Sequence, residues 1–251
     1  MRVVSWNLGV AYSFEASHER AWHYLAALDA DIAFLQEVKP PAWASERWDI
    51  EMAPHKQWGS AILAKPGLGL TSYPDQTQGV LGHFGPYLAT ATVVPAPGVS
   101  LLVASVHTSA RVASQDVLAG LDAEAIRRPS VDVPWRNDLA YSAYRNLVMD
   151  RRFLVSGDWN TARLWDKVYG GSGGVDFFDR AAADGWVECH RMFHDEEGRT
   201  WFRGAEQPYQ LDHAFCDPVT AEALKSCEID PYPVETLVLS DHAPLVMEFA
   251  L

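Results

Sequence analysis

The stretch Phe153–Asn160 reads FLVSGDWN, a short apolar run that leads into Gly157 and then into polar residues. An apolar run of this length bounded by glycine is typical of a buried strand. On an extended chain, Asp158 and Asn160 point the same way because they are two residues apart, and Trp159 faces elsewhere. The stretch therefore predicts a buried strand that presents two polar side chains at its end.

The same pattern recurs along the chain, at the ends of other predicted strands. The polar residues at these positions are Asn7, Glu37, His107, Asp158, Asn160, Asp212, Asp241 and His242. A single Asp after a strand is more often a turn or helix cap, because its carboxylate bonds nearby backbone N–H groups. As a set, these residues offer oxygen ligands for a hard cation, neutral donors for phosphate oxygens and imidazoles that carry protons. The set therefore contains what phosphoester hydrolysis requires.

Predicted strands outnumber predicted helices. Strands are expected at 3–7, 31–36, 58–64, 68–73, 87–94, 101–107, 153–156, 209–215, 220–229 and 245–249. Helices are expected at 17–28, 113–126, 136–149 and 176–183, with a glycine-rich loop at 170–174. Many strands with few helices predict two sheets packed face to face, with helices over their outer faces. No linker divides the chain, so residues 1–251 are expected to form a single catalytic domain.

The composition is that of an ordinary globular protein, with 48% hydrophobic and 21% charged residues. The apolar runs are much shorter than the roughly 20 residues of a membrane helix, so we expect no membrane span. The N-terminus, MRVVSWN, lacks the apolar region of a signal peptide, and we expect a cytoplasmic protein. The cysteines, Cys189, Cys216 and Cys227, are odd in number and show no metal-binding spacing, which predicts reduced, buried thiols.

The formal net charge of -13 opposes a broad attraction to nucleic acid. It does not exclude a nuclease, because an acidic protein can bind a cation through carboxylates and let that cation meet the phosphate. The charge that matters is therefore the local charge at the site.

Six short words, in order, resemble the motif series of the endonuclease/exonuclease/phosphatase superfamily. They are SWN (5–7), LQE (35–37), SVHT (105–108), GDWN (157–160), QLDH (210–213) and SDH (240–242). The resemblance spans nearly the whole chain, and GDWN and SDH are its most specific words. It implies an α/β four-layer sandwich, with two packed mixed β-sheets flanked by helices and the site at one end. It also implies Mg²⁺, or Mn²⁺ in its place.

The resemblance also implies how the metal is held. Glu37 is the expected principal metal ligand, helped by Asn7 directly or through water. Asp241 would either help to bind the metal or fix the ring of His242. Such a set suits Mg²⁺, which usually takes one or two carboxylates and keeps several waters.

Roles in the reaction follow from the same resemblance. Asp158 would orient or polarise the attacking water, and Asn160 would donate to a nonbridging oxygen. His242 would act either as the base for water or as a cationic stabiliser of developing charge. His107 would donate to phosphate or protonate the leaving oxygen, and Asp212 would position a histidine or other polar partner.

The branch of the superfamily is narrowed by two positions. Gly9 stands where the apurinic endonuclease branch usually has an acid, and His107 is typical of the deoxyribonuclease-like branches. We expect a monomer that hydrolyses phosphodiester bonds as a nuclease or phosphodiesterase. Its expected substrate is a phosphoester, and nucleic acid is one candidate. One alternative is a phosphatase or phospholipase-type hydrolase acting on a lipid or small molecule. Another is a noncatalytic binding module on the same fold.

Overall fold

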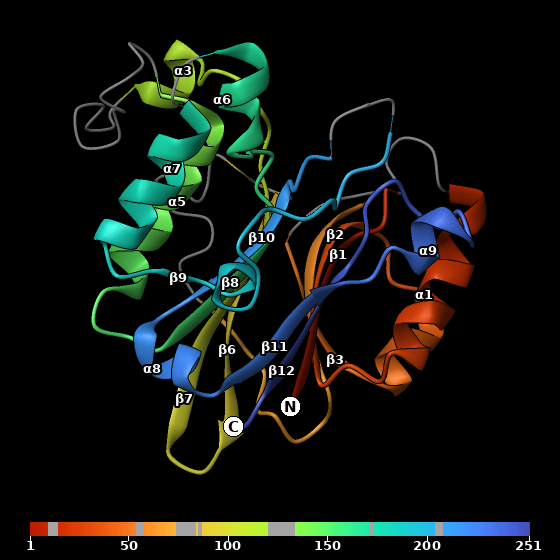
Figure 1. The fold of residues 1–251 in the computed structure, drawn as a ribbon. Coiled ribbons are helices and arrows are strands. Elements are labelled where there is room, and N and C mark those ends of the chain that lie inside the picture. Colours follow the sequence, from red (N-terminus) through yellow and green to blue (C-terminus); the bar gives the residue numbers. More distant parts are fainter. Residues whose placement is uncertain are drawn as a thin grey trace.

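Two mixed β-sheets lie face to face, with helices on their outer sides (Figure 1). The structure, a computed structural model, describes residues 1–9, 15–53, 58–73, 84, 87–119, 134–170, 173–203 and 208–251, and within these ranges each sheet has six strands. The first sheet has the order β11 (Leu224–Ile229), β12 (Leu245–Phe249), β1 (Arg2–Asn7), β2 (Ile32–Val38), β4 (Gly59–Ala64) and β3 (Asp49–Met52). The second has the order β5 (Thr71–Ser72), β6 (Leu88–Ala96), β7 (Val99–His107), β8 (Phe153–Asp158), β10 (Asp212–Cys216) and β9 (Val187–Glu188).

Helices and short 3-10 turns connect and cover the strands. The helices are α1 (His18–Ala27), α3 (Gln115–Leu118), α5 (Arg136–Val148), α6 (Leu164–Tyr169), α7 (Gly173–Ala183), α8 (Pro218–Glu222) and α9 (Tyr232–Glu235). The 3-10 turns are η1 (Glu15–Ser17), η2 (Ala42–Glu46) and η4 (His190–Met192). Within the described ranges, none of the helices combines the length and the apolar character needed to cross a lipid bilayer.

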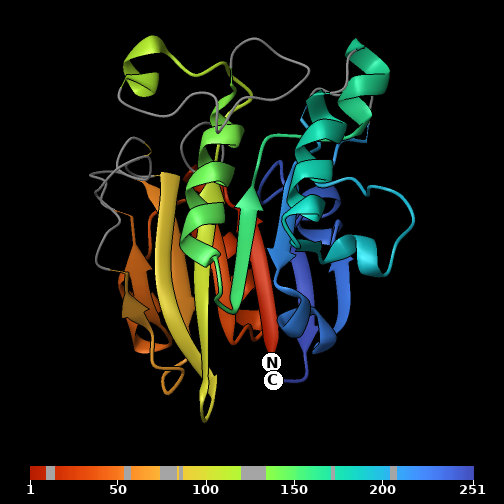
Figure 2. The same cartoon turned by 90° about the vertical axis from the view of Figure 1, so that its left-hand side faces the viewer.

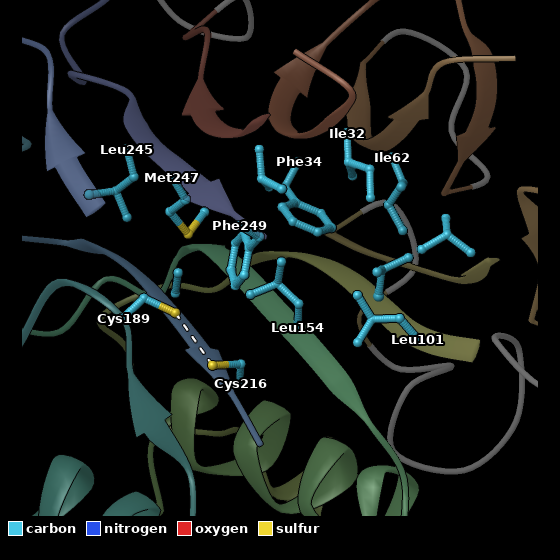
Figure 3. Packing of buried hydrophobic residues seen from close by; sticks show 14 of the residues in the cluster. Ile32, Phe34, Ile62, Leu101, Leu154, Cys189, Cys216, Leu245, Met247 and Phe249 are labelled. Carbon is cyan, nitrogen blue, oxygen red and sulfur yellow. Dashed lines mark hydrogen bonds between the residues drawn. The ribbon is translucent and has the colours of Figure 1, made fainter. Parts of the chain in front are cut away.

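The hydrophobic core has one central and two outer parts. Between the sheets, Phe34 of the first sheet faces Leu154 of the second (Figure 3). On the outer face of the second sheet, Tyr144 of α5 and Phe177 of α7 are completely buried. On the outer face of the first sheet, Trp22 of α1 is completely buried. The layers run helix, sheet, sheet, helix, which confirms the predicted four-layer sandwich.

A parallel strand pair at the centre of each sheet positions the polar residues. β1 and β2 are parallel, with Asn7 opposite Gln36, and β7 and β8 are parallel, with His107 opposite Asp158. Parallel neighbours end at the same edge of a sheet, and β8 points toward the top of Figure 2. The two chain termini lie together near the bottom of that view, with the Met1 amino group 2.6 Å from the Phe249 carbonyl.

Two predicted strands near the C-terminus are wrong in their bounds. The strand predicted at 220–229 begins only at Leu224, because Asp217 and Pro218 start a helix first. The Asp217 carboxylate accepts from the Thr220 N–H at 2.9 Å, and Pro218 occupies the first turn, where its missing N–H costs nothing. The strand predicted at 209–215 begins at Asp212.

Several other predicted bounds also differ. Strand β3 and helix α6 were not predicted, and the strand expected at 68–73 is only the two residues of β5. Helix α7 begins at Gly173, inside the expected loop at 170–174. Of the helix expected at 113–126, the structure shows α3 at Gln115–Leu118. The part of the expected helix beyond residue 119 lies outside the described residues.

All three cysteines are buried free thiols, as predicted. Cys189 and Cys216 approach each other in the central core, with their Sγ atoms 3.7 Å apart (Figure 3). That separation is a thiol contact, because a disulfide bond is about 2.05 Å long.

Gly157, just before Asp158, occupies a position where no side chain fits. Its φ is +149°, and a Cβ there would lie 2.0 Å from the Val106 carbonyl oxygen and 2.9 Å from Gln36 Nε2. Gly157→Ala should therefore push β7 and β8 apart and lower the free energy of unfolding by about 3 kcal/mol or more, measured by urea denaturation.

Gly98→Ala is the matched control for this effect. Gly98 also has a positive φ, +78°, but nothing lies within 4 Å of a Cβ placed there. Its loss should be only the backbone strain of about 1 to 2 kcal/mol. Equal losses in the two variants would contradict the steric argument.

Candidate active site

The predicted polar residues converge at one end of the sandwich, where both sheets contribute side chains. Asn7 and Glu37 come from β1 and β2 of the first sheet, and His107, Asp158 and Asp212 come from the second. Asp158 lies opposite His107 on β7 and opposite Asp212 on β10, so these three form one row across the second sheet. Neighbouring residues in such a row share a face of the sheet and lie within contact distance.

His242 enters the site from the loop before β12 and is held on several sides. Its Nδ1 lies 2.8 Å from Asp212 Oδ2, and its backbone carbonyl accepts from Trp6 Nε1 at 2.7 Å. Its backbone N–H donates to Ser240 Oγ at 3.1 Å, while the Ser240 hydroxyl donates to the Asn7 carbonyl at 2.6 Å. The position of the ring relative to β1 and β10 is therefore fixed.

The carboxylates around His242 change its protonation. Burial alone would lower its pKa, but the negative charges of Asp212 and Asp158 and the hydrogen bond to Asp212 outweigh burial and raise the pKa to about 10. An opposite charge within a few ångströms favours the charged form of a titratable group. His242 is therefore an imidazolium at neutral pH in the metal-free protein.

Asp158 is the central acid of the site. Its Oδ2 accepts from Asn7 Nδ2 at 3.1 Å, and its Oδ1 accepts from the Asn160 N–H at 3.0 Å. The Nε2 atoms of His107 and His242 each lie 3.8 Å from its Oδ2. Burial raises its pKa to about 7 against the opposing charge of His242. Asp158 is therefore a carboxylate able to accept a proton near neutral pH.

Asn160 lies next to Asp158, but not on an extended chain. β8 ends at Asp158, and Asn160 has a left-handed φ of 48°, so the assumption of an extended chain through Asn160 is wrong. Its Nδ2 donates to the Thr108 carbonyl at 3.0 Å. An amide nitrogen has two N–H donors, which leaves one for a ligand oxygen.

Glu37 and His107 face each other between the sheets, with 3.5 Å between Glu37 Oε1 and His107 Nε2. Glu37 has a φ of 52° at the irregularity in the β2–β4 pairing. Burial lowers the pKa of His107 to about 4, and the positive charge of His242 acts in the same direction. His107 is therefore a neutral imidazole at neutral pH, and its contact with Glu37 is not an ion pair.

Asp241 is the one predicted site residue without a contact in this cluster. Its carboxylate is half-buried and forms no hydrogen bond or ion pair within the described part of the chain, and its backbone carbonyl accepts from Phe202 at 2.9 Å. The ring of His242 is bonded by Asp212 instead.

Two supporting residues had no assigned role in the sequence analysis. Ser240 links His242 to β1 through its two hydrogen bonds. It is part of the SDH word, so the sequence contained a pattern that could have identified it. Thr200 Oγ accepts from the Asp212 N–H at 3.1 Å and so holds the start of β10. Nothing in the sequence around Thr200 marks it.

The site contains oxygen donors of the kind that a hard divalent cation prefers. Glu37, Asp158 and Asp212 supply buried carboxylates, and Asp212 Oδ1 is buried without a hydrogen-bond partner among the described residues. Ligand atoms of Asp158, Asp212 and His242 lie within 4.8 Å of one another. However, a protonated imidazole has no lone pair to offer, so His242 does not fit as a ligand while it carries its proton. Carboxylate and amide oxygens are the ligands that Mg²⁺ prefers.

Comparisons with known proteins identify the family of the chain and its fold. The sequence matches the Endonuclease/Exonuclease/phosphatase family over residues 4–242. A search of curated proteins found no match. Among solved structures, a 3′ phosphatase from Neisseria bound to a product DNA hairpin has a TM-score of 0.68 at 22% identity, and all of both chains is covered. An AP endonuclease from Archaeoglobus fulgidus has a TM-score of 0.67 at 14% identity, also with all of both chains covered. At these identities the structural similarity shows a shared fold.

The family match covers both sheets and every residue of the cluster described above. It begins at Val4 in β1 and ends at His242, so it includes the polar ends of β2, β7 and β8 and the start of β10. The chain belongs to the Endonuclease/Exonuclease/phosphatase family, whose named activities all hydrolyse phosphoester bonds.

Proposed function

We propose that the chain is a Mg²⁺-dependent phosphodiesterase that acts on nucleic acid. The observation that carries the proposal is the pairing of Asp158 with His242. Asp158 is buried with a raised pKa of about 7, and His242 Nε2, on a ring with a pKa of about 10, lies 3.8 Å from it. Two neighbouring groups whose environments set opposite protonation states are typical of an acid and a base in hydrolysis. Because both sheets supply these groups, one catalytic domain over residues 1–251 is part of the proposal.

The reaction adds water across a P–O bond and gives a phosphomonoester and an alcohol. Asp158 accepts a proton from the attacking water, because it is the central acid able to take one near neutral pH. Because His242 carries a proton in the metal-free protein, the proposal assigns it the role of the cation beside the phosphate and not that of the base. Its Nε2 proton is then available to the departing oxygen.

The remaining groups stabilise charge and orient the phosphate. The second N–H of Asn160 donates to a nonbridging oxygen, and neutral His107 offers a further polar contact on the side of Glu37. Glu37 and Asn7 would hold the metal ion. A bound metal ion would neutralise part of the negative charge of the phosphate. Donors fixed before the reaction stabilise the transition state without reorganisation.

A phosphatase acting on monoesters is the second candidate function. It is favoured by the structural similarity to a protein described as a 3′ phosphatase. The convergence of buried acids and histidines in one cluster supports either hydrolase over a noncatalytic binding module, because such groups are costly to bury without a use.

A substrate screen with purified protein tests the proposed function. With Mg²⁺ and Mn²⁺, the substrates are single- and double-stranded DNA, RNA, sphingomyelin, inositol phosphates and bis-p-nitrophenyl phosphate. We expect cleavage of the nucleic acids and of the synthetic diester, abolished by EDTA. Hydrolysis of monoesters alone would overturn the diesterase proposal, and activity that survives EDTA would overturn the metal requirement.

Glu37→Gln tests the assigned metal ligand. The substitution keeps the size of the side chain but removes a negatively charged ligand. The Mg²⁺ concentration for half-maximal activity should rise by about 10- to 100-fold. Loss of a residue that only hydrogen-bonds a metal ligand already weakens metal binding by this factor, so loss of a ligand should do so at least as strongly. A magnesium titration of the hydrolysis rate measures the change. Glu51→Gln is the control, because Glu51 lies on the edge strand β3, and an unchanged requirement in Glu37→Gln would contradict the assignment.

A further inference from the structure

A small pocket adjoins the candidate active site and shares one of its residues. It has a volume of about 170 Å³ and is lined by His107, Ser109, Arg111, Arg136 and the aromatic residues Phe84 and Tyr87. Thr108 completes the wall, and its carbonyl accepts from Asn160. The pocket is therefore continuous with the residues proposed to contact the scissile phosphate.

Arg111 and Arg136 give this pocket a positive charge within a chain whose net charge is -13. Neither guanidinium forms an ion pair or side-chain hydrogen bond with another residue in the described ranges, unlike Arg163 and Arg180, which bind carboxylates. An arginine side chain without a carboxylate partner keeps its N–H donors available for an anion.

The backbone holds the two arginines together although they are far apart in sequence. The Arg136 N–H donates to the Arg111 carbonyl at 2.9 Å, and the Ala113 N–H donates to the Pro134 carbonyl at 2.9 Å. Val112 and Trp135 form an isolated bridge between the same two segments. The backbone pairing of the loop after β7 with the start of α5 therefore brings both arginine side chains to one pocket.

Two buried polar atoms of the pocket residues also lack partners. Ser109 Oγ and His107 Nδ1 are inaccessible to solvent and form no hydrogen bond within the described part of the chain. His107 is 8% exposed. Buried polar atoms without partners are rare because each costs free energy. Both atoms belong to side chains that line the pocket, so a turn of either side chain towards a bound polar ligand would remove this cost.

We propose that this pocket binds a second phosphate of the substrate, one that is not hydrolysed. The inference deepens the proposed function and rests on it. In a nucleic acid strand, each scissile phosphate has another phosphate one nucleotide away, whereas sphingomyelin and bis-p-nitrophenyl phosphate have a single phosphate. The pocket therefore selects oligonucleotides, and it explains how a strongly acidic chain attracts an anionic polymer through local charge.

The test compares dinucleotides that differ only in a terminal phosphate. The substrates are thymidylyl-(3′→5′)-thymidine and its 5′- and 3′-phosphorylated forms, which place the extra phosphate on either side of the scissile one. For the wild-type protein, kcat/KM should be about 10-fold higher for one phosphorylated form, the lower end expected for charge-assisted hydrogen bonds. The double variant Arg111→Gln/Arg136→Gln should lose this preference and change the unphosphorylated dinucleotide by less than about twofold.

Arg151→Gln is the matched control, because Arg151 is exposed and precedes β8 at the end opposite to Asp158. It should keep the preference. Circular dichroism and thermal unfolding of each variant establish that the chain is folded. The inference is overturned if the wild-type protein shows no preference, or if the double variant loses all three substrates equally.

A binding measurement separates this inference from the proposed function. Calorimetric titration in EDTA, with the same three dinucleotides, needs no turnover. If no dinucleotide is hydrolysed, the proposed diesterase activity fails, but tighter binding of a phosphorylated form that depends on Arg111 and Arg136 still supports the pocket. Equal binding of all three forms by the wild-type protein would overturn the pocket even in an active enzyme.

Discussion

Asp158→Asn should lower kcat for phosphodiester hydrolysis by about 10³- to 10⁴-fold, the upper part of the range for loss of general acid–base catalysis. The amide has the same shape as the carboxyl group, but it cannot accept a proton from water. It can keep the hydrogen bond from the Asn160 N–H through its oxygen. The loss should therefore appear in kcat more than in KM, measured by steady-state kinetics with a synthetic diester.

Asp150→Asn is the control for this substitution. Asp150 is exposed and precedes β8 at the end opposite to Asp158, and its φ of 59° is a conformation that Asn tolerates well. Its kcat should stay within about twofold of the wild-type value, as for surface changes of small energetic effect. A similar kcat in Asp158→Asn would remove Asp158 from the proposed proton transfer.

The strand ends that carry the site were readable from local sequence. In FLVSGDWN and in SWN, an apolar strand runs directly into a polar residue, so Asp158 and Asn7 were expected at strand ends. The structure places both there, with 3.1 Å between Asn7 Nδ2 and Asp158 Oδ2. The order of the six words along the chain then indicated the family, and the family implied the four-layer sandwich.

Contacts that depend on the pairing of distant strands, such as the carboxylate that bonds His242, could not be predicted from local sequence. The resemblance predicted that Asp212 would position a histidine or other polar partner, and that Asp241 would either fix the ring of His242 or help to bind the metal. It did not say which histidine Asp212 would contact. In the structure Asp212 bonds the ring, because β10 pairs with β8 and sets Asp212 opposite Asp158. That register joins residues more than 50 positions apart, and no local pattern encodes it.

Local backbone conformation was also missed where it departs from regular strands. Asn160 and Glu37 both have a positive φ, which sequence periodicity does not reveal for residues other than glycine. The proximity of Arg111 and Arg136 could not be predicted either, since it depends on how the start of α5 packs against the loop after β7. The residue types of the site were therefore predictable, but their mutual orientation was not.

Asp212→Asn should lower the pKa of His242 from about 10 towards its ordinary value of 6.5. The substitution removes both the negative charge and the charged hydrogen-bond acceptor at 2.8 Å, and burial then acts against the protonated ring with less opposition. Nuclear magnetic resonance of the His242 ring in the metal-free protein, followed from pH 5 to pH 11, measures the shift directly.

Activity should follow the same change in protonation. Because the folded wild-type protein holds the His242 proton up to about pH 10, loss of this proton should not limit wild-type activity at pH 8 to 9. In Asp212→Asn the ring loses its proton at a lower pH, so activity should fall as pH rises through that lowered pKa. With a pKa of about 6.5, only about 3% of the rings carry the proton at pH 8, so we expect a loss of about 30-fold in kcat at that pH.

Asp241→Asn separates the two carboxylates that the sequence left as neighbours of His242. Asp241 has the smallest of the charge effects that raise the pKa of the ring, and its carboxylate does not bond the ring. Its substitution should therefore move the His242 pKa much less than Asp212→Asn does. If Asp241→Asn produced the larger shift, Asp241 and not Asp212 would control the histidine, and the proton assignment in the proposed mechanism would fail with it.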